Sequence, residues 1–208
     1  MPPALEARRA LRHLKRVDAR LAELISRVGP LRLVARPANS PFEALLRAIT
    51  YQQLSSKAAA TIHGRLLGLF PRGLTPRGLL ATPASDLQSA GLSRNKLLAM
   101  RDLAAKTLDG TVPDFAVLEA LSDDAIIERL TTVRGVGHWT AEMLLIFTLG
   151  RPDVLPLGDL GIRKGFQLVY GMKRLPAAVT LQRAGRVWTP HRSVASWYLW
   201  RALDIETP

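Results

Sequence analysis

Apolar residues recur roughly every three to four positions along most of the chain, which is the spacing of an amphipathic helix. The first stripe predicts one long helix that ends at Gly29-Pro30. Its members are Leu11, Leu14, Val17, Leu21, Leu24, Ile25 and Val28. Ser40 followed by Pro41 predicts the cap and first residue of a second helix, and a third helix should begin after Ser55 or Ser56.

A polar cap, an apolar face and a terminal glycine follow one another repeatedly further along the chain. The pattern recurs in SDLQSAG, SRNKLLAMRDLAAKTLDG, DFAVLEAL and SDDAIIERL. No segment of any length alternates apolar and polar residues as a strand would. We therefore predict an all-α fold of about ten helices with short loops, without a linker or a repeat of fixed period.

Length and charge narrow the class of protein. The 208 residues suit one good-sized domain or two small lobes. The chain has 29 Lys and Arg residues against 17 Asp and Glu residues, and this positive excess favours a polyanionic partner. A solvated Arg-rich surface explains the excess equally well. The chain has no cysteine, which excludes disulfides, thiolate-bound zinc and iron–sulfur clusters. No apolar run is long enough for a membrane span, so we expect a cytoplasmic or nucleoid-associated protein.

The segment LTTVRGVGHWTAEMLL, residues 130–145, predicts the end of one helix, a tight glycine turn and the start of another. Gly135 and Gly137 are expected to accept positive φ and to let the backbone approach a partner closely. The next helix start is expected to present unpaired N–H groups, so the turn suits a phosphate and would bind DNA without reading its sequence. Arg134 and His138 add charge. A tight helix–helix corner with a glycine cap explains Gly-x-Gly equally well.

Asp159 follows Pro156-Leu157-Gly158 and precedes LGIRKGFQLVY, which predicts a helix. Aspartate is a favoured N-cap, so a structural role is sufficient to explain the residue. From the residues alone, the cap is favoured over a chemical role.

Four ordered segments together resemble the helix-hairpin-helix superfamily of DNA base-excision glycosylases. LTTVRGVGHWTAEMLL and GRPDVLPLGDLGIRKGF match its hairpin and its loop with aspartate, while AITYQQLSSKAA and TPHRSVASWYLWRAL resemble the alkylation-damage branch, 3-methyladenine DNA glycosylase II. The resemblance implies a two-lobed fold, with residues 40–152 as the central lobe and the hairpin at about 123–150. Residues 1–39 and 153–208 would form the second lobe, and the chain has no room for the N-terminal α/β domain of some members.

In this superfamily the position of Asp159 carries the catalytic carboxylate. It would stabilise positive charge on the deoxyribose as the base departs, or orient the attacking water. A ring-alkylated purine is already cationic and leaves neutral, so one carboxylate suffices. Members that also cut the strand carry a Schiff-base lysine two places after the second hairpin glycine. Trp139 stands there, which implies hydrolysis without strand cleavage.

The resemblance also implies a pocket for a base taken out of the stack. Trp139 and Trp200 are its expected aromatic walls, with Met143 where an alkylation glycosylase can present a tyrosine. Trp188 and Trp197 are expected in the core instead.

A side chain must fill the gap left in the duplex, and we call this residue the wedge. Gln53 is the expected wedge, with Gln52 and Leu54 as alternatives; a polar helix end explains each equally well. The expected backbone contacts are Arg134, Gly135, Val136, Gly137, His138 and Thr140. Five further basic residues could contact phosphate, although a solvated basic face explains each equally well. They are Lys57, Arg94, Lys96, Arg163 and Lys164. The main-chain carbonyls of Thr131, Val133 and Val136 would hold Na⁺ or K⁺, and no cofactor is required.

The sequence thus favours a monomeric, monofunctional glycosylase that removes alkylated bases such as 3-methyladenine from double-stranded DNA. A non-catalytic DNA-binding module and a glycosylase for oxidised or mismatched bases are the alternatives. Asp159 counts against the module, because a carboxylate facing DNA without chemistry would only repel phosphate. A stacking-rich pocket with few hydrogen-bonding groups would favour a cationic base over the other lesions.

Overall fold

The computed structural model describes residues 4–34 and 38–205, and these residues form helices without any strand. The predicted all-α class is confirmed. The described residues form thirteen α-helices and one 3-10 helix, more than the expected ten or so, because the opening stripe forms two helices and two connecting segments contain the short helices α5 and α12. No helix among the described residues is long and apolar enough to cross a membrane.

The helices in chain order are α1 (Ala4–Val17), α2 (Ala19–Val28), α3 (Pro41–Tyr51), α4 (Ser56–Gly68), α5 (Pro76–Ala81), α6 (Ala84–Ser89), α7 (Arg94–Leu108), α8 (Phe115–Ala120), α9 (Asp123–Thr131), α10 (His138–Phe147), α11 (Leu160–Val169), α12 (Ala178–Gly185), η1 (Arg186–Trp188) and α13 (Arg192–Ile205). Ser40 and Ser55 cap α3 and α4 as predicted, with side-chain oxygens that accept from the backbone N–H three residues on.

The prediction of a single opening helix is wrong, because the helix is interrupted at Asp18 and continues as a second helix. One carboxylate oxygen of Asp18 accepts from the backbone N–H of Leu21 at 3.0 Å and so caps α2. The other accepts from the Tyr170 hydroxyl and, at 2.8 Å, from the Trp188 indole N–H. Burial, and secondly the hydrogen bond to Asp18, raise the pKa of the Tyr170 hydroxyl above its ordinary range. The apolar stripe continues through the break, so periodicity alone could not reveal it.

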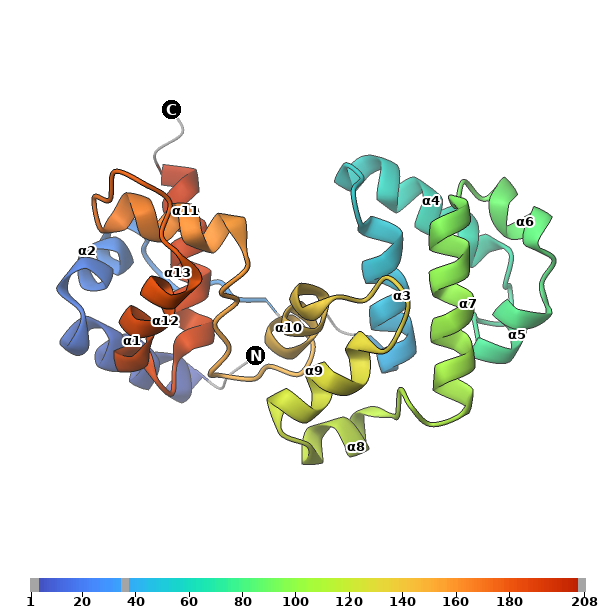
Figure 1. The fold of residues 1–208 in the computed structure, drawn as a ribbon, viewed down its shortest axis with the longest axis horizontal. Helices are drawn as coiled ribbons and strands as arrows, with labels where there is room; N and C mark the ends of the chain where they lie inside the picture. Colours follow the sequence, from blue (N-terminus) through green and yellow to red (C-terminus); the bar gives the residue numbers. More distant parts are fainter. Residues whose placement is uncertain (1–3, 35–37, 206–208) are drawn as a thin grey trace. The chain divides into compact units, whose positions relative to one another are not determined.

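The chain divides into two compact units. The central unit is Pro37–Leu144, and the split unit combines Met1–Arg36 with Leu145–Pro208. The predicted division had placed the second boundary at residue 152, whereas the change of unit falls within α10. In the split unit, α11 packs along α13 (Figure 1). The two backbones approach so closely that a Cβ on Gly165 would lie 2.0 Å from the carbonyl oxygen of Leu199.

In the central unit, α7 packs against α3 and α5. Leu45 and Ile49 of α3 and Met100 and Leu103 of α7 are fully buried. The turn between α9 and α10 lies beside α3 and α7 (Figure 1). This framework positions the glycine turn on rigid helices.

Candidate functional site

The glycine turn joins α9 to α10 as predicted. Val133 and Val136 are buried and anchor the turn, whereas Arg134, Gly135 and Gly137 are exposed. Only Gly135 has a positive φ, of 76°, so the expectation of positive φ at both glycines is wrong for Gly137. A Cβ on Gly137 would meet no protein atom within 4 Å. The fold therefore gives no reason for glycine at 137, while close approach of an external group gives one.

Two side chains of α7 hold this turn by its backbone. Asp102 accepts from the N–H of Arg134 at 2.7 Å and from the Lys106 ammonium at 3.0 Å. Lys106 also donates to the carbonyl of Thr132. Burial alone would raise the pKa of Asp102, but the hydrogen bonds from Arg134 and Lys106 hold it below its usual value. Sequence reasoning missed this pair, whose only signal was an acid and a base four residues apart on a helix.

The YQQL segment, residues 51–54, forms a type II turn at the end of α3. Gln52 has φ −54° and ψ 132°, and Gln53 has φ 57°, the only positive φ among the described non-glycine residues. The N–H of Leu54 donates to the carbonyl of Tyr51 at 3.4 Å and closes the turn weakly. The side chains of Gln53 and Leu54 are exposed. The side-chain amide of Gln52 donates to the carbonyl of Gly135 at 2.9 Å, so it is bound to the glycine turn.

Asp159 is the N-cap of α11, as its sequence context predicts. Its Oδ1 accepts from the N–H of Ile162 at 2.7 Å and from the indole N–H of Trp200 at 2.9 Å. The residue is only 8% exposed. The Trp200 ring stacks on Phe147 with centroids 5.7 Å apart. Trp200 therefore lies beside the carboxylate and holds it in place.

The loop before Asp159 is attached to the start of α13. Arg192 forms a two-pronged ion pair with Asp153, with N–O distances of 2.7 and 2.8 Å. Ser193 donates through its hydroxyl to the carbonyl of Arg151 at 2.7 Å and accepts from the N–H of Val154 at 3.0 Å. These contacts restrict the path of the Gly- and Pro-rich loop, and nothing in the linear sequence pairs these residues.

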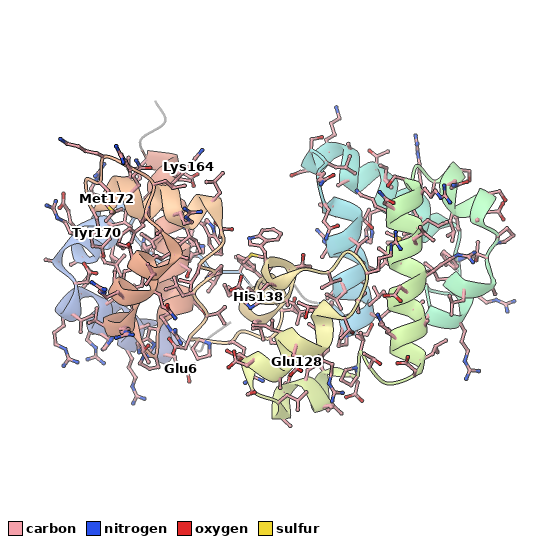
Figure 2. The ribbon with its side chains drawn as sticks, viewed as in Figure 1. Glu6, Glu128, His138, Lys164, Tyr170 and Met172 are labelled. Carbon is pink, nitrogen blue, oxygen red and sulfur yellow. The ribbon has the colours of Figure 1, made fainter. Side chains whose placement is uncertain are left out.

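The other predicted residues differ in their surroundings. Trp139 is 49% exposed on α10, Met143 is half-buried and Thr140 is buried. His138 begins α10 (Figure 2), and its Nδ1 lies 3.3 Å from a carboxylate oxygen of the buried Glu142. Trp188 and Trp197 are buried, which confirms their expected place in the core.

The five basic candidates separate into two groups. Lys57, Arg94 and Lys164 are exposed, the last on α11 (Figure 2). Lys96 instead donates to the carbonyl of Thr50 at 2.6 Å, and Arg163 to that of Pro176 at 2.9 Å. Burial lowers the pKa of Lys96. Among the described residues, no three His, Cys, Asp or Glu side chains gather as metal ligands would.

An all-helical fold with a glycine hairpin and an aspartate at the start of the following helix defines the class of this protein. The chain belongs to the HhH-GPD superfamily of base excision DNA repair proteins, whose family model matches residues 46–191. This confirms the predicted superfamily.

Individual relatives place the chain more closely. It is 35% identical to DNA-3-methyladenine glycosylase 1 of Schizosaccharomyces pombe over 198 residues, which cover 93% of this chain and 86% of the relative. The chain is also similar to a solved structure from that organism, 3-methyladenine DNA glycosylase Mag1 in complex with abasic DNA. The TM-score is 0.80, and the match covers 93% of this chain and 95% of the Mag1 chain. A DNA-3-methyladenine glycosidase from Bacillus halodurans has a TM-score of 0.82 at 36% identity, covering 91% and 86% of the two chains.

Proposed function

We propose that the protein is a monomeric DNA glycosylase that hydrolyses the N-glycosidic bond of alkylated bases, 3-methyladenine among them, in double-stranded DNA. The observation that carries the proposal is the buried carboxylate of Asp159, held by Trp200 and Ile162 in a chain similar to 3-methyladenine glycosylases. Capping of α11 accounts for the bond to Ile162, whereas the second donor, Trp200, supports a catalytic carboxylate over a non-catalytic DNA-binding module.

Asp159 acts on the sugar rather than on the base. As the bond to the base breaks, positive charge develops on the deoxyribose, and a preorganised carboxylate stabilises it or orients the attacking water. An alkylated purine carries its own positive charge and leaves without a proton donor. The aromatic ring of Trp200, which lies beside Asp159, would receive the cationic base by stacking and cation–π attraction.

The glycine turn and the YQQL turn serve DNA binding in this proposal. Backbone N–H groups at residue 135 and residues 137–140, with Arg134 and His138, contact phosphate, whereas the N–H of Val136 donates to the carbonyl of Val133 at 3.0 Å. The carbonyls of Thr131, Val133 and Val136 suit a hard monovalent cation such as Na⁺ or K⁺, since each carbonyl oxygen has two lone pairs. Gln53 acts as the wedge, because a non-glycine residue kept at φ 57° stores backbone strain, and such strain concentrates at functional positions.

Replacement of Asp159 by Asn tests the catalytic assignment. Asn keeps the Oδ1 acceptor for Ile162 and Trp200 but removes the charge, so folding and duplex binding should persist while base release falls by orders of magnitude. The measurement is chromatography of the bases released from methylated duplex by both proteins. Near-normal release by the variant would remove Asp159 from the mechanism. If the wild type released only oxidised or mismatched bases, the protein would be a glycosylase for those lesions and not for alkylated bases.

The proposed activity leaves the abasic strand intact. Trp139 stands where strand-cutting members carry a lysine, and a tryptophan cannot form a Schiff base. Borohydride added during reaction with lesion-containing duplex should trap no covalent protein–DNA product, and strand breaks should appear only after hot alkali. Trapping and breakage at the rate of base release would show that another amine acts as nucleophile.

A further inference from the structure

We infer that Gln52 is a positioning residue that fixes the YQQL turn to the glycine turn, so that the two segments proposed to contact DNA move as one element. The inference rests on the proposed function and assigns Gln52 a role different from that of Gln53. The two turns are far apart in the sequence, and the side-chain amide of Gln52 joins them by its 2.9 Å hydrogen bond to the carbonyl of Gly135.

The YQQL turn needs such support because its own geometry is costly. The second central position of a type II turn favours glycine or asparagine, whereas Gln53 occupies it with φ 57°. The single backbone hydrogen bond that closes the turn is long, at 3.4 Å. An exposed turn with a strained residue and one weak internal bond keeps its shape only when its surroundings hold it. Lys96 holds the carbonyl of Thr50 just before the turn, and Gln52 holds the turn itself.

The acceptor in this bond is itself fixed. Gly135 directly follows two backbone groups that α7 binds, the carbonyl of Thr132 by Lys106 and the N–H of Arg134 by Asp102. A Cβ on Gly135 would lie 3.2 Å from that of Ala99, so the turn also packs directly on α7. Gln52 therefore connects the strained turn to a rigid point. When phosphate binds the glycine turn, the position of Gly135 then sets where Gln53 enters the duplex.

A double-mutant cycle tests this role. Gln52→Met keeps the length of the side chain and removes the donor, and Gln53→Gly removes the wedge while suiting the positive φ. Because a misplacement of about 1 Å can cost about 100-fold, Gln52→Met should slow single-turnover base release by about 10- to 100-fold. Affinity for undamaged duplex should stay within about threefold, since the phosphate contacts of the glycine turn remain.

The decisive comparison is the double variant. If Gln52 acts through Gln53, adding Gln52→Met to Gln53→Gly slows base release no further. Losses that multiply, or an unchanged rate for Gln52→Met alone, would overturn the inference. Gln88→Met, at an exposed position on α6, is the matched control and should leave the rate unchanged.

A second measurement separates this inference from the proposed function. Fluorescence of 2-aminopurine beside the target base reports unstacking without any bond cleavage. The wild type should raise the fluorescence and Gln52→Met should reduce that rise, even if the protein released no alkylated base. Absence of base release with this pattern would refute the proposed chemistry alone. Equal fluorescence for the wild type and Gln52→Met would refute the positioning role alone.

Discussion

Asp159 serves the fold and the proposed chemistry with the same oxygen. Its Oδ1 caps α11 through Ile162 and accepts from the Trp200 indole, so the carboxylate is oriented by two donors from two helices. The interpretation as a cap and the interpretation as a catalytic group were alternatives in the sequence. In the structure they are compatible, because the bond that caps α11 and the bond from Trp200 orient the same carboxylate oxygen.

Removal of the Trp200 donor tests this double role. Trp200→Phe keeps a ring to stack on Phe147 but removes the N–H, and a hydrogen bond to a charged group contributes about 1.5–3 kcal/mol. We expect single-turnover base release to fall by about tenfold or more. Trp188→Phe is the matched control, because it removes an indole bond to a different carboxylate, Asp18. It should lower the melting temperature and leave the release rate unchanged. Normal release by Trp200→Phe would contradict the role.

In the glycine turn, positions 135 and 137 are occupied by glycine for different reasons. Gly135 lies in the left-handed region and packs near Ala99, so the fold requires it. Gly137 has neither constraint, and its Cβ position opens to the surface. The spacing Gly-x-Gly could not show this difference, because φ depends on how α7 and the buried valines hold the turn.

Substitution of the two glycines by alanine should therefore separate stability from binding. Gly135→Ala should lower the free energy of unfolding by about 1–2 kcal/mol, the cost of a left-handed L-residue. Gly137→Ala should leave the melting temperature unchanged but weaken duplex binding by about tenfold, because the new methyl group intrudes between peptide and phosphate. Thermal melts and fluorescence anisotropy with undamaged duplex measure the two effects. Unchanged affinity in Gly137→Ala would argue against phosphate contact at this turn.

At the scale of the whole molecule, the formal charge of +12 favours a polyanionic partner, and membership of a DNA repair superfamily identifies that partner as DNA. In both units, some basic side chains are engaged within the protein. Lys96, Lys106 and Arg192 bind protein groups, so the net charge overstates what is available to phosphate.

Duplex affinity should nevertheless depend steeply on salt. Each neutralised phosphate contributes about −0.9 to the slope of log K against log salt concentration, so six to ten contacts weaken binding about 10³- to 10⁵-fold between 50 and 200 mM salt. A titration of undamaged duplex over this range measures the slope. A change of less than tenfold would mean that few phosphates are contacted and that the basic surface is mainly solvated.

The sequence by itself determined the features that arise between near neighbours. Helical periodicity gave the all-α class, and Ser40, Ser55 and Asp159 identified helix starts, because a cap bonds to an N–H only three residues away. The glycine turn and its two flanking helices were predictable for the same reason. The resemblance of four local segments was sufficient to indicate the superfamily.

The tertiary structure alone decided the contacts between distant residues. The carboxylate of Asp18, at the interruption between α1 and α2, accepts hydrogen bonds from aromatic donors in the last third of the chain. Gln52 is bound to Gly135, and Trp200 donates to Asp159, across separations of 83 and 41 residues. A linear pattern contains no distances between such residues. Which polar side chain finds which partner is settled only when the helices pack and each buried donor and acceptor must be paired.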